Sequence, residues 1–137
     1  MKSKEIMEKN YKSKLFKIKT FIFDVDGVLT DGKVIVTTEG EMYRALDTKD
    51  GYAMKYAMIK GFKIAIISGG TNEGIRNRFQ ALGVKDIYLG AHEKSAAYDE
   101  LVNNYKLKPD EILYIGDDIP DLPLSLIHIS EPTRQVL

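Results

Sequence analysis

Two groups of aspartates in this sequence could do chemistry together. They lie in FIFDVDGVLT (residues 21–30) and GDDIPDLP (residues 116–123), and they are Asp24, Asp26, Asp117, Asp118 and Asp121. An isolated Asp-x-Asp pair more often serves a turn than a reaction. Two acidic groups that meet in one crevice repel each other unless a cation neutralises them, and an all-oxygen site suits a hard ion such as Mg²⁺. The two groups together therefore predict a magnesium-dependent active site.

Asp24 is the candidate nucleophile. A carboxylate beside Mg²⁺ can attack phosphorus and form an aspartyl-phosphate, which divides the hydrolysis of a phosphate ester into two displacements. Asp26 follows where a strand should give way to a loop, so it could donate a proton to the leaving oxygen and later take one from the attacking water. These roles predict a phosphatase.

The transferred phosphoryl group also needs hydrogen-bond donors for its oxygens. The Ser68 hydroxyl, nearby backbone N–H groups and the Lys94 ammonium could supply them. A structural interpretation stays open for both side chains, because a Ser before Gly-Gly is a common loop residue and a Lys in a first helical turn is usually solvated.

The composition is that of one ordinary globular domain. Of its residues, 44% are hydrophobic and 29% are charged. A length of 137 residues is enough to bury one core but not two independent ones. Lys plus Arg and Asp plus Glu both number 20, so no net charge favours nucleic acid or an acidic membrane. The absence of Cys excludes disulfides and thiolate metal sites. Because the Lys-rich residues 1–19 contain no apolar run of signal-peptide length, we expect a polar, helical lead and a cytoplasmic protein that binds neither nucleic acid nor membrane.

Strands and helices should alternate along the chain. Apolar, β-prone runs predict strands at residues 20–24, 62–67, 86–89 and 112–115. Apolar residues at helical spacing predict helices at residues 50–60, from a Thr71 cap to Gly83, and at residues 92–105. Residues 33–46 should form a projecting β-hairpin that turns at Glu39-Gly40. This alternation is typical of an α/β fold with a doubly wound parallel sheet.

A sheet of this kind binds its ligands beyond the carboxyl ends of its strands. Asp24 and Asp26 follow the first predicted strand, Ser68 follows the second and Asp117 the fourth. Lys94 opens the helix after the third strand. The predicted topology therefore brings the candidate residues to one edge of the sheet.

These residues resemble, in order and spacing, the four motifs of the haloacid-dehalogenase (HAD) phosphatases. The matching segments are DVDGVLTDG (24–32), ISG (67–69), Lys94 and GDDIPDLP (116–123). The resemblance implies a HAD-like, Rossmann-type domain over residues 20–123. It also implies Mg²⁺ bound by Asp24, the Asp26 backbone carbonyl and Asp117, with Asp118 and Asp121 in support.

Within that superfamily, the motifs are most similar to small enzymes that hydrolyse a sugar-acid phosphate in lipopolysaccharide precursor synthesis. That similarity implies substrate contacts from Asp26, Asp47, Thr48, Lys49, Asp50, Gly51, Gly69, Arg78 and Lys94. Only the hairpin and one helix fit between Asp24 and Ser68, which leaves no room for a cap domain. Members without a cap close the site with neighbouring subunits, typically as a homotetramer built around the hairpin. Many relatives have Arg where this chain has Gly70, so one anion contact is missing.

The end of the chain departs from the family pattern. After Pro123 that pattern continues with another strand and helix, whereas this chain reads LSLIHISEPTRQVL (124–137). This string resembles translated sequencing-adapter DNA, so we expect residues 124–137 to be a non-native tail and the C-terminal part of the fold to be missing. The edge of the fourth strand would then be uncovered and the protein prone to aggregation.

Alternatives to this interpretation stay open. The phosphatase-like domain attached to some acylneuraminate cytidylyltransferases, and phosphatases of nine-carbon sugar acids, share much of the pattern. A receiver-type phospho-acceptor module also has an α/β sheet, an acidic Mg²⁺ pocket and a Lys, although receivers carry the acceptor Asp after a central strand and the acidic pair after the first. The last alternative is an inactive fragment.

Overall fold

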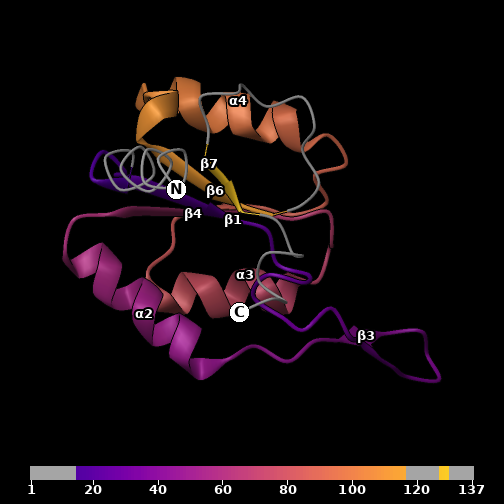
Figure 1. The fold of residues 1–137 in the computed structure, drawn as a ribbon. Helices are drawn as coiled ribbons and strands as arrows, with labels where there is room; N and C mark the ends of the chain where they lie inside the picture. The colour runs from indigo at the N-terminus through magenta and orange to yellow at the C-terminus, as the bar shows by residue number, and fades with distance from the viewer. Residues whose placement is uncertain (1–14, 117–126, 130–137) are drawn as a thin grey trace, which may run out of the picture.

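The computed structural model describes residues 15–116 and 127–129 (Figure 1). Most of the predicted helical lead, and the candidate residues Asp117, Asp118 and Asp121, lie outside the described residues.

A five-stranded parallel sheet forms the centre of the domain, in the order β5-β4-β1-β6-β7. Its strands are β1 (Thr20–Phe23), β4 (Lys63–Ile67), β5 (Asp86–Tyr88), β6 (Ile112–Ile115) and β7 (Ile127–Ile129). The first four confirm the predicted strands to within one residue at each end. In the middle of the sheet, Phe23 of β1 is in register with Ile66 on one side and Ile115 on the other. Because β1, β4 and β6 run in parallel, their carboxyl ends meet at one edge.

Strand β7 overturns the expectation that the edge of β6 is uncovered. Leu113 pairs with Ile127 and Ile115 with Ile129, again in parallel. A three-residue segment with two β-branched side chains is well suited to add itself to an open sheet edge. Such pairing needs only a compatible segment, so it is independent of where residues 124–137 come from, and their non-native origin stays a hypothesis.

Helices cover both faces of the sheet, which confirms the doubly wound arrangement. Helices α2 (Thr48–Ile59) and α3 (Glu73–Leu82) lie on one face and α4 (Lys94–Tyr105) on the other (Figure 1). The sheet has a hydrophobic core on each face: the first core lies under α2 and α3, and the second core lies under α4. Ile64 and Ile66 of β4 pack into the first core, whereas Ala65 and Ile67 pack into the second. Alternate side chains of a strand point to opposite faces, so the continuous apolar run of β4 is buried twice.

The structure corrects the start of each of the three predicted helices. Asn72, not Thr71, caps α3, because the Asn72 side chain accepts a hydrogen bond of 2.8 Å from the Gly74 backbone N–H. The helix ends at Gly83, as predicted. Asp47 caps α2, which begins two residues earlier than expected, and α4 begins at Lys94, two residues later. A short 3₁₀ turn, Pro109–Glu111, leads into β6.

The predicted β-hairpin is present as β2 (Ile35–Val36) paired antiparallel with β3 (Met42–Tyr43). It projects away from the layers of the domain (Figure 1), and these four apolar side chains are exposed. Within the described residues, no helix combines the length and the apolar composition that crossing a membrane requires.

Candidate active site

Asp24 lies at the carboxyl end of the central strand and is held by contacts on both of its oxygens. Its backbone N–H donates to the Ile115 carbonyl (2.9 Å), which continues the pairing of β1 with β6. Oδ1 accepts from the Val25 N–H (2.7 Å), and Oδ2 lies 2.5 Å from Lys94 Nζ. The residue is only 6% exposed. A carboxylate this well buried needs such partners, and they fix its orientation.

Lys94 is the first residue of α4, and this position places its ammonium group against Asp24. Its side chain is 11% exposed. The solvated interpretation of Lys94 is therefore wrong, and the structure joins two candidate residues that are 70 positions apart.

The loop after β1 is tied together by Thr30. The Thr30 hydroxyl oxygen accepts from the N–H groups of Gly27 (3.3 Å) and Gly32 (3.1 Å). Both glycines have positive φ, of 80° and 82°, a conformation that other residues adopt only at a cost. Val28 and Leu29 are buried between them. This role of Thr30 was not predicted from the sequence, although its place between two turn-forming glycines was a usable signal.

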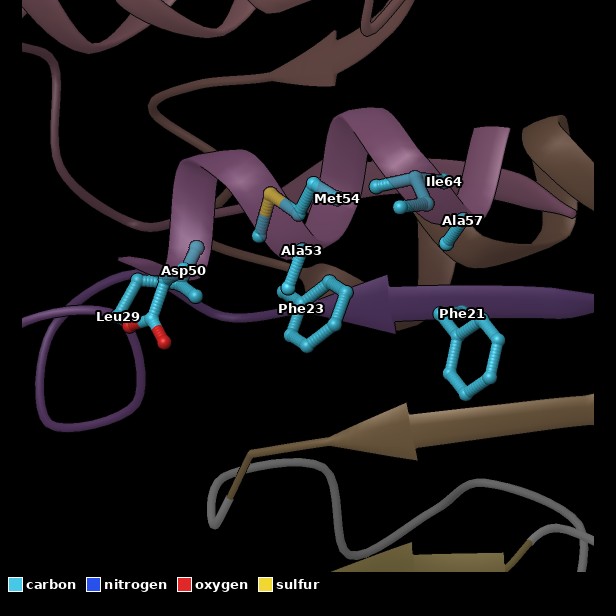
Figure 2. Close-up of a pocket in the computed structure, with 8 residues that line it drawn as sticks. All are labelled: Phe21, Phe23, Leu29, Asp50, Ala53, Met54, Ala57 and Ile64. Carbon is cyan, nitrogen blue, oxygen red and sulfur yellow. The ribbon is translucent and has the colours of Figure 1, made fainter. Parts of the chain in front are cut away.

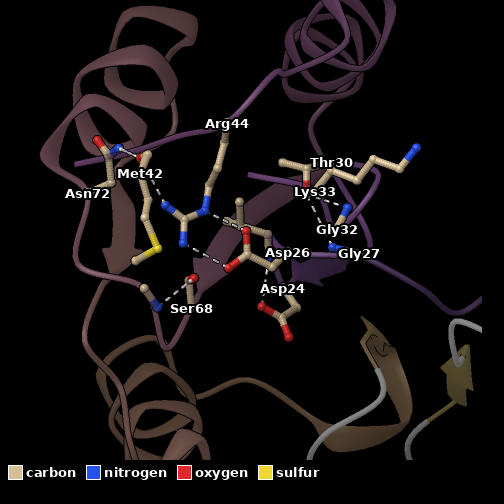
Figure 3. Close-up of polar contacts among 12 residues, drawn as sticks. Asp24, Asp26, Gly27, Thr30, Gly32, Lys33, Met42, Arg44, Ser68 and Asn72 are labelled. Atoms are coloured by element: carbon tan, nitrogen blue, oxygen red, sulfur yellow. Dashed lines mark hydrogen bonds and ion pairs between the residues drawn. The ribbon is translucent and has the colours of Figure 1, made fainter. Parts of the chain in front are cut away.

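Asp26 contacts Arg44 (Figure 3). Arg44 Nε lies 2.7 Å from Asp26 Oδ1, and Nη2 lies 3.3 Å from Oδ2. The Asp26 side chain is 42% exposed and that of Arg44 is 10% exposed. Asp26 is thus reachable by a substrate. Arg44, like Thr30, was not predicted from the sequence to have a functional role.

Ser68 follows β4 and is buried. Its Oγ accepts from the Gly70 N–H (3.2 Å), which shapes the Ser68-Gly69-Gly70 loop. Its own O–H has no acceptor among the residues that the structure describes. The structural and functional interpretations of Ser68 are therefore compatible, since the hydroxyl can order the loop and still donate to a ligand.

Gly116 brings the end of β6 against Asp24. A Cβ built on Gly116 would lie 3.1 Å from the Cβ of Asp24 and 2.7 Å from Cε1 of Tyr114. Only a residue without a side chain allows this approach. Asp117 is bonded to Gly116, and its own placement is outside the described residues.

The oxygen atoms of Asp24 and Asp26 fit a hard cation such as Mg²⁺ by their chemistry. Within residues 15–116 and 127–129, no three His, Cys, Asp or Glu residues group closely enough to hold a metal ion. The third ligand that the motifs predict is Asp117, which lies outside the described residues.

The other predicted substrate contacts lie at the start of α2 and on α3. Asp47 Oδ1 accepts from the Lys49 N–H (2.8 Å), so Asp47 caps the helix whose first turn holds Thr48, Lys49 and Asp50. A Cβ on Gly51 would lie 3.3 Å from Arg78 Nη2 and 3.2 Å from Leu82 Cδ1. Gly51 therefore lets the Arg78 side chain lie against α2.

A groove of about 280 Å³ runs along β1 and α2 (Figure 2). It is lined by Phe21, Phe23, Leu29, Asp50, Ala53, Met54, Ala57 and Ile64. Asp50 is the one charged residue of this lining. Because convergent polar groups are what mark a reactive site, the carboxyl edge of the sheet is the better candidate.

Known proteins share this fold and are similar in sequence. A structure from Legionella pneumophila, a hydrolase of the HAD superfamily (subfamily III A), is 36% identical, with a TM-score of 0.84 over 93% of this chain and 71% of that one. A 3-deoxy-D-manno-octulosonate 8-phosphate phosphatase from Moraxella catarrhalis, solved with a magnesium ion, a phosphate ion and a KDO molecule, is 34% identical, with a TM-score of 0.74 over 80% of this chain and 63% of that one.

Curated sequences agree with these structures. The 3-deoxy-D-manno-octulosonate 8-phosphate phosphatase of Yersinia pestis is 35% identical over 107 residues, which is 78% of this chain and 57% of the relative. The chain thus spans little more than half the length of the curated relatives it matches. No protein-family model matches it.

Proposed function

This chain belongs to the HAD superfamily, subfamily IIIA, and from that premise we propose that it is a Mg²⁺-dependent phosphatase of a sugar-acid phosphate. The reaction would pass through an aspartyl-phosphate on Asp24. The observation that carries the proposal is the placement of Asp24 at the carboxyl end of β1, nearly buried, with Lys94 2.5 Å from its Oδ2.

Asp24 would attack phosphorus. Its oxygens are already oriented by Val25 and Lys94, so little conformational freedom is lost when the substrate arrives. Ser68, the backbone N–H of Gly69 and the Lys94 ammonium would donate to the phosphoryl oxygens, on which negative charge is concentrated during transfer.

Asp26 would act first as acid and then as base. Two residues beyond the nucleophile, on the loop held by Thr30, it is exposed enough to reach the leaving oxygen. It would protonate that oxygen as the P–O bond breaks, and later take a proton from the water that hydrolyses the aspartyl-phosphate.

Asp24, the Asp26 backbone carbonyl and Asp117 would hold Mg²⁺, with Asp118 and Asp121 in support. When bound there, the cation would supply charge neutralisation at the phosphoryl oxygens.

We favour 3-deoxy-D-manno-octulosonate 8-phosphate as the substrate. Support comes from the names of the relatives and from the KDO and phosphate in the Moraxella structure. Asp47, Thr48, Lys49, Asp50, Gly51 and Arg78 would contact the sugar from the start of α2 and from α3. A nine-carbon sugar-acid phosphate, or the role of an acylneuraminate cytidylyltransferase domain, remains the alternative. The receiver alternative has no support from these relatives.

The proposed assembly is a cytoplasmic homotetramer in the full-length parent, with the hairpin at the subunit contacts. The exposed Ile35, Val36, Met42 and Tyr43 support it, because exposed apolar patches usually mark contact surfaces. Sedimentation of the parent protein with and without an Ile35→Lys change tests it. A parent that sediments as a monomer would refute this part.

A phosphate-release screen with Mg²⁺ tests the function. The substrates are 3-deoxy-D-manno-octulosonate 8-phosphate, a nine-carbon sugar-acid phosphate and a neutral sugar phosphate, with this chain, the full-length parent and Asp24→Asn compared. Sustained release that Asp24→Asn abolishes supports the proposal. A single stoichiometric phosphorylation indicates a receiver, neither outcome indicates an inactive fragment, and full activity in Asp24→Asn contradicts the nucleophile.

A further inference from the structure

Arg44 sits between three parts of the candidate site. It follows β3 at the base of the hairpin, its guanidinium contacts Asp26, and Nη2 lies 3.5 Å from where a Cβ on Gly70 would stand. Figure 3 shows the guanidinium above Asp26, on the side toward Ser68. The base of the hairpin thus places a guanidinium beside Asp26 and Gly70.

The backbone that carries Arg44 is anchored to the domain. The Asn72 side chain, which caps α3, donates from Nδ2 to the Met42 carbonyl (3.2 Å). This hydrogen bond ties the base of the hairpin to the N-terminus of α3. Its acceptor, Met42, is only two positions before Arg44. A residue fixed by such support is positioned in advance for a ligand.

The guanidinium has donors to spare. Of its five N–H groups, Nε and Nη2 contact Asp26, and Nη1 makes a long contact of 3.5 Å with the Met42 carbonyl. Among the described residues, these are its acceptors. Gly70 adds no side chain against Nη2, so the space next to that nitrogen is left to a ligand.

Fold stability does not account for a cation at this place. An ion pair whose carboxylate is 42% exposed contributes little to stability, yet the Arg44 side chain is 90% withdrawn from solvent. Burial of a guanidinium for so weak a pair is better explained by recognition of an anion.

The two cations of the site are each assigned to one aspartate. Lys94 lies at the nucleophile Asp24, where the phosphoryl group is attacked, whereas Arg44 lies at Asp26, where the leaving oxygen is protonated. A planar guanidinium matches a carboxylate, with which it can form two parallel hydrogen bonds. We propose that Arg44 recognises the carboxylate of the sugar-acid substrate, on the leaving-group side of the site. This inference rests on the proposed function.

Equilibrium binding separates recognition from a structural role. The full chain is titrated calorimetrically with 3-deoxy-D-manno-octulosonate and with its methyl ester, which keeps the sugar and removes the charge. Wild type is compared with Arg44→Lys, Arg44→Ala, and Arg44→Ala combined with Gly70→Arg. Gly70 does not have a positive φ, so the backbone accepts an arginine there, and that side chain starts beside the vacated space. Melting curves report whether each variant is folded.

The readout is the ratio of the two affinities. Wild type should bind the acid about 10- to 100-fold more tightly than the ester. Arg44→Ala should reduce the ratio to about 1, because it weakens only the acid. Arg44→Lys should keep part of it, since the charge remains without the fork, and the relocated arginine should restore part of it. A purely structural role would lower both affinities together and leave the ratio unchanged.

An unchanged ratio in a folded Arg44→Ala, or a wild type that does not prefer the acid, overturns the inference. Phosphate release measured on the same preparations keeps this result apart from the proposed function. Release with an unchanged ratio refutes Arg44 recognition and keeps the phosphatase. If the ratio falls to about 1 in Arg44→Ala but the wild type releases no phosphate, recognition by Arg44 is kept and the phosphatase is refuted.

Discussion

An alanine at position 116 should disturb the candidate active site, because its Cβ would crowd both Tyr114 and Asp24. A Cβ there would lie 2.7 Å from Cε1 of Tyr114, about 0.8 Å short of the ~3.5 Å at which two carbons pack without strain. Tyr114 is fully buried in the second core, and the next nearest atom is the Cβ of Asp24, at 3.1 Å. Either the ring or Asp24 must move.

The expected loss follows from that crowding. Overpacking of a filled core costs about 1–3 kcal/mol, and the lower chain entropy of alanine returns about 0.4–1 kcal/mol. Gly116→Ala should therefore lower the unfolding free energy by about 1–2 kcal/mol, which for 137 residues is a fall in Tm of about 3–8 °C. A shift of Asp24 by a few tenths of an ångström should slow phosphate release by about 10-fold or more.

Thermal melts and phosphate release measure the two effects. Gly69→Ala is the matched control for the melt alone, because a Cβ there meets nothing within 4 Å and its φ is not positive. The control should melt at or slightly above the wild-type temperature. If Gly116→Ala melted like Gly69→Ala and kept wild-type turnover, the close packing of β6 against Asp24 would be refuted.

Three further predictions follow from the site and the core. Thr30→Val removes the acceptor of two loop N–H groups and should cost about 1–2 kcal/mol in urea unfolding, whereas Thr30→Ser should not. Lys94→Met removes the cation beside buried Asp24 and, without Mg²⁺, should lower the free energy of unfolding by about 3 kcal/mol. Adding Mg²⁺ should raise the Tm of this variant more than it raises the Tm of wild type. Equal Mg²⁺-induced shifts in Tm would contradict this prediction. Burial, with a smaller effect from Asp99, raises the pKa of Tyr98 to about 12. The folded protein holds that proton more tightly than the unfolded chain does. The contribution of Tyr98 to the free energy of unfolding should therefore be fully present below pH ~10 and be lost from pH ~10 to ~12. Tyr98→Phe should remove this loss. At neutral pH, Tyr98→Phe should leave stability unchanged or raise it by up to about 1 kcal/mol, since this hydroxyl has no partner within the described part of the chain.

Local patterns were enough to predict the sheet and the edge that carries the site. The continuous apolar run at 62–67 predicted a strand buried on both faces, and Ile64 and Ala65 do belong to different cores. Once the strands are known to be parallel, residues that follow them must share an edge. The meeting of Asp24 with Lys94, 70 positions later, follows from this topology.

Contacts set by side-chain competition could not be predicted in the same way. Thr71 and Asn72 can both cap a helix, and only the path of the chain decides that Asn72 faces the Gly74 N–H. The Arg44–Asp26 contact joins a hairpin to a loop 18 positions away, and nothing in the alternation of the hairpin indicates where its base is anchored. Strand β7 was missed because a three-residue strand has too few residues to show a period.

The proposed nucleophilic role of Asp24 is tested most directly by looking for the phosphoryl group on the protein. The protein is mixed with a sugar-acid phosphate and Mg²⁺, quenched in acid within the first turnover, digested and analysed by mass spectrometry. We expect one phosphoryl group on the peptide that contains Asp24, formed and lost at rates that match turnover, and none in Asp24→Asn. Rapid phosphate release with Asp24 never phosphorylated, or with the phosphoryl group on another residue, would contradict it.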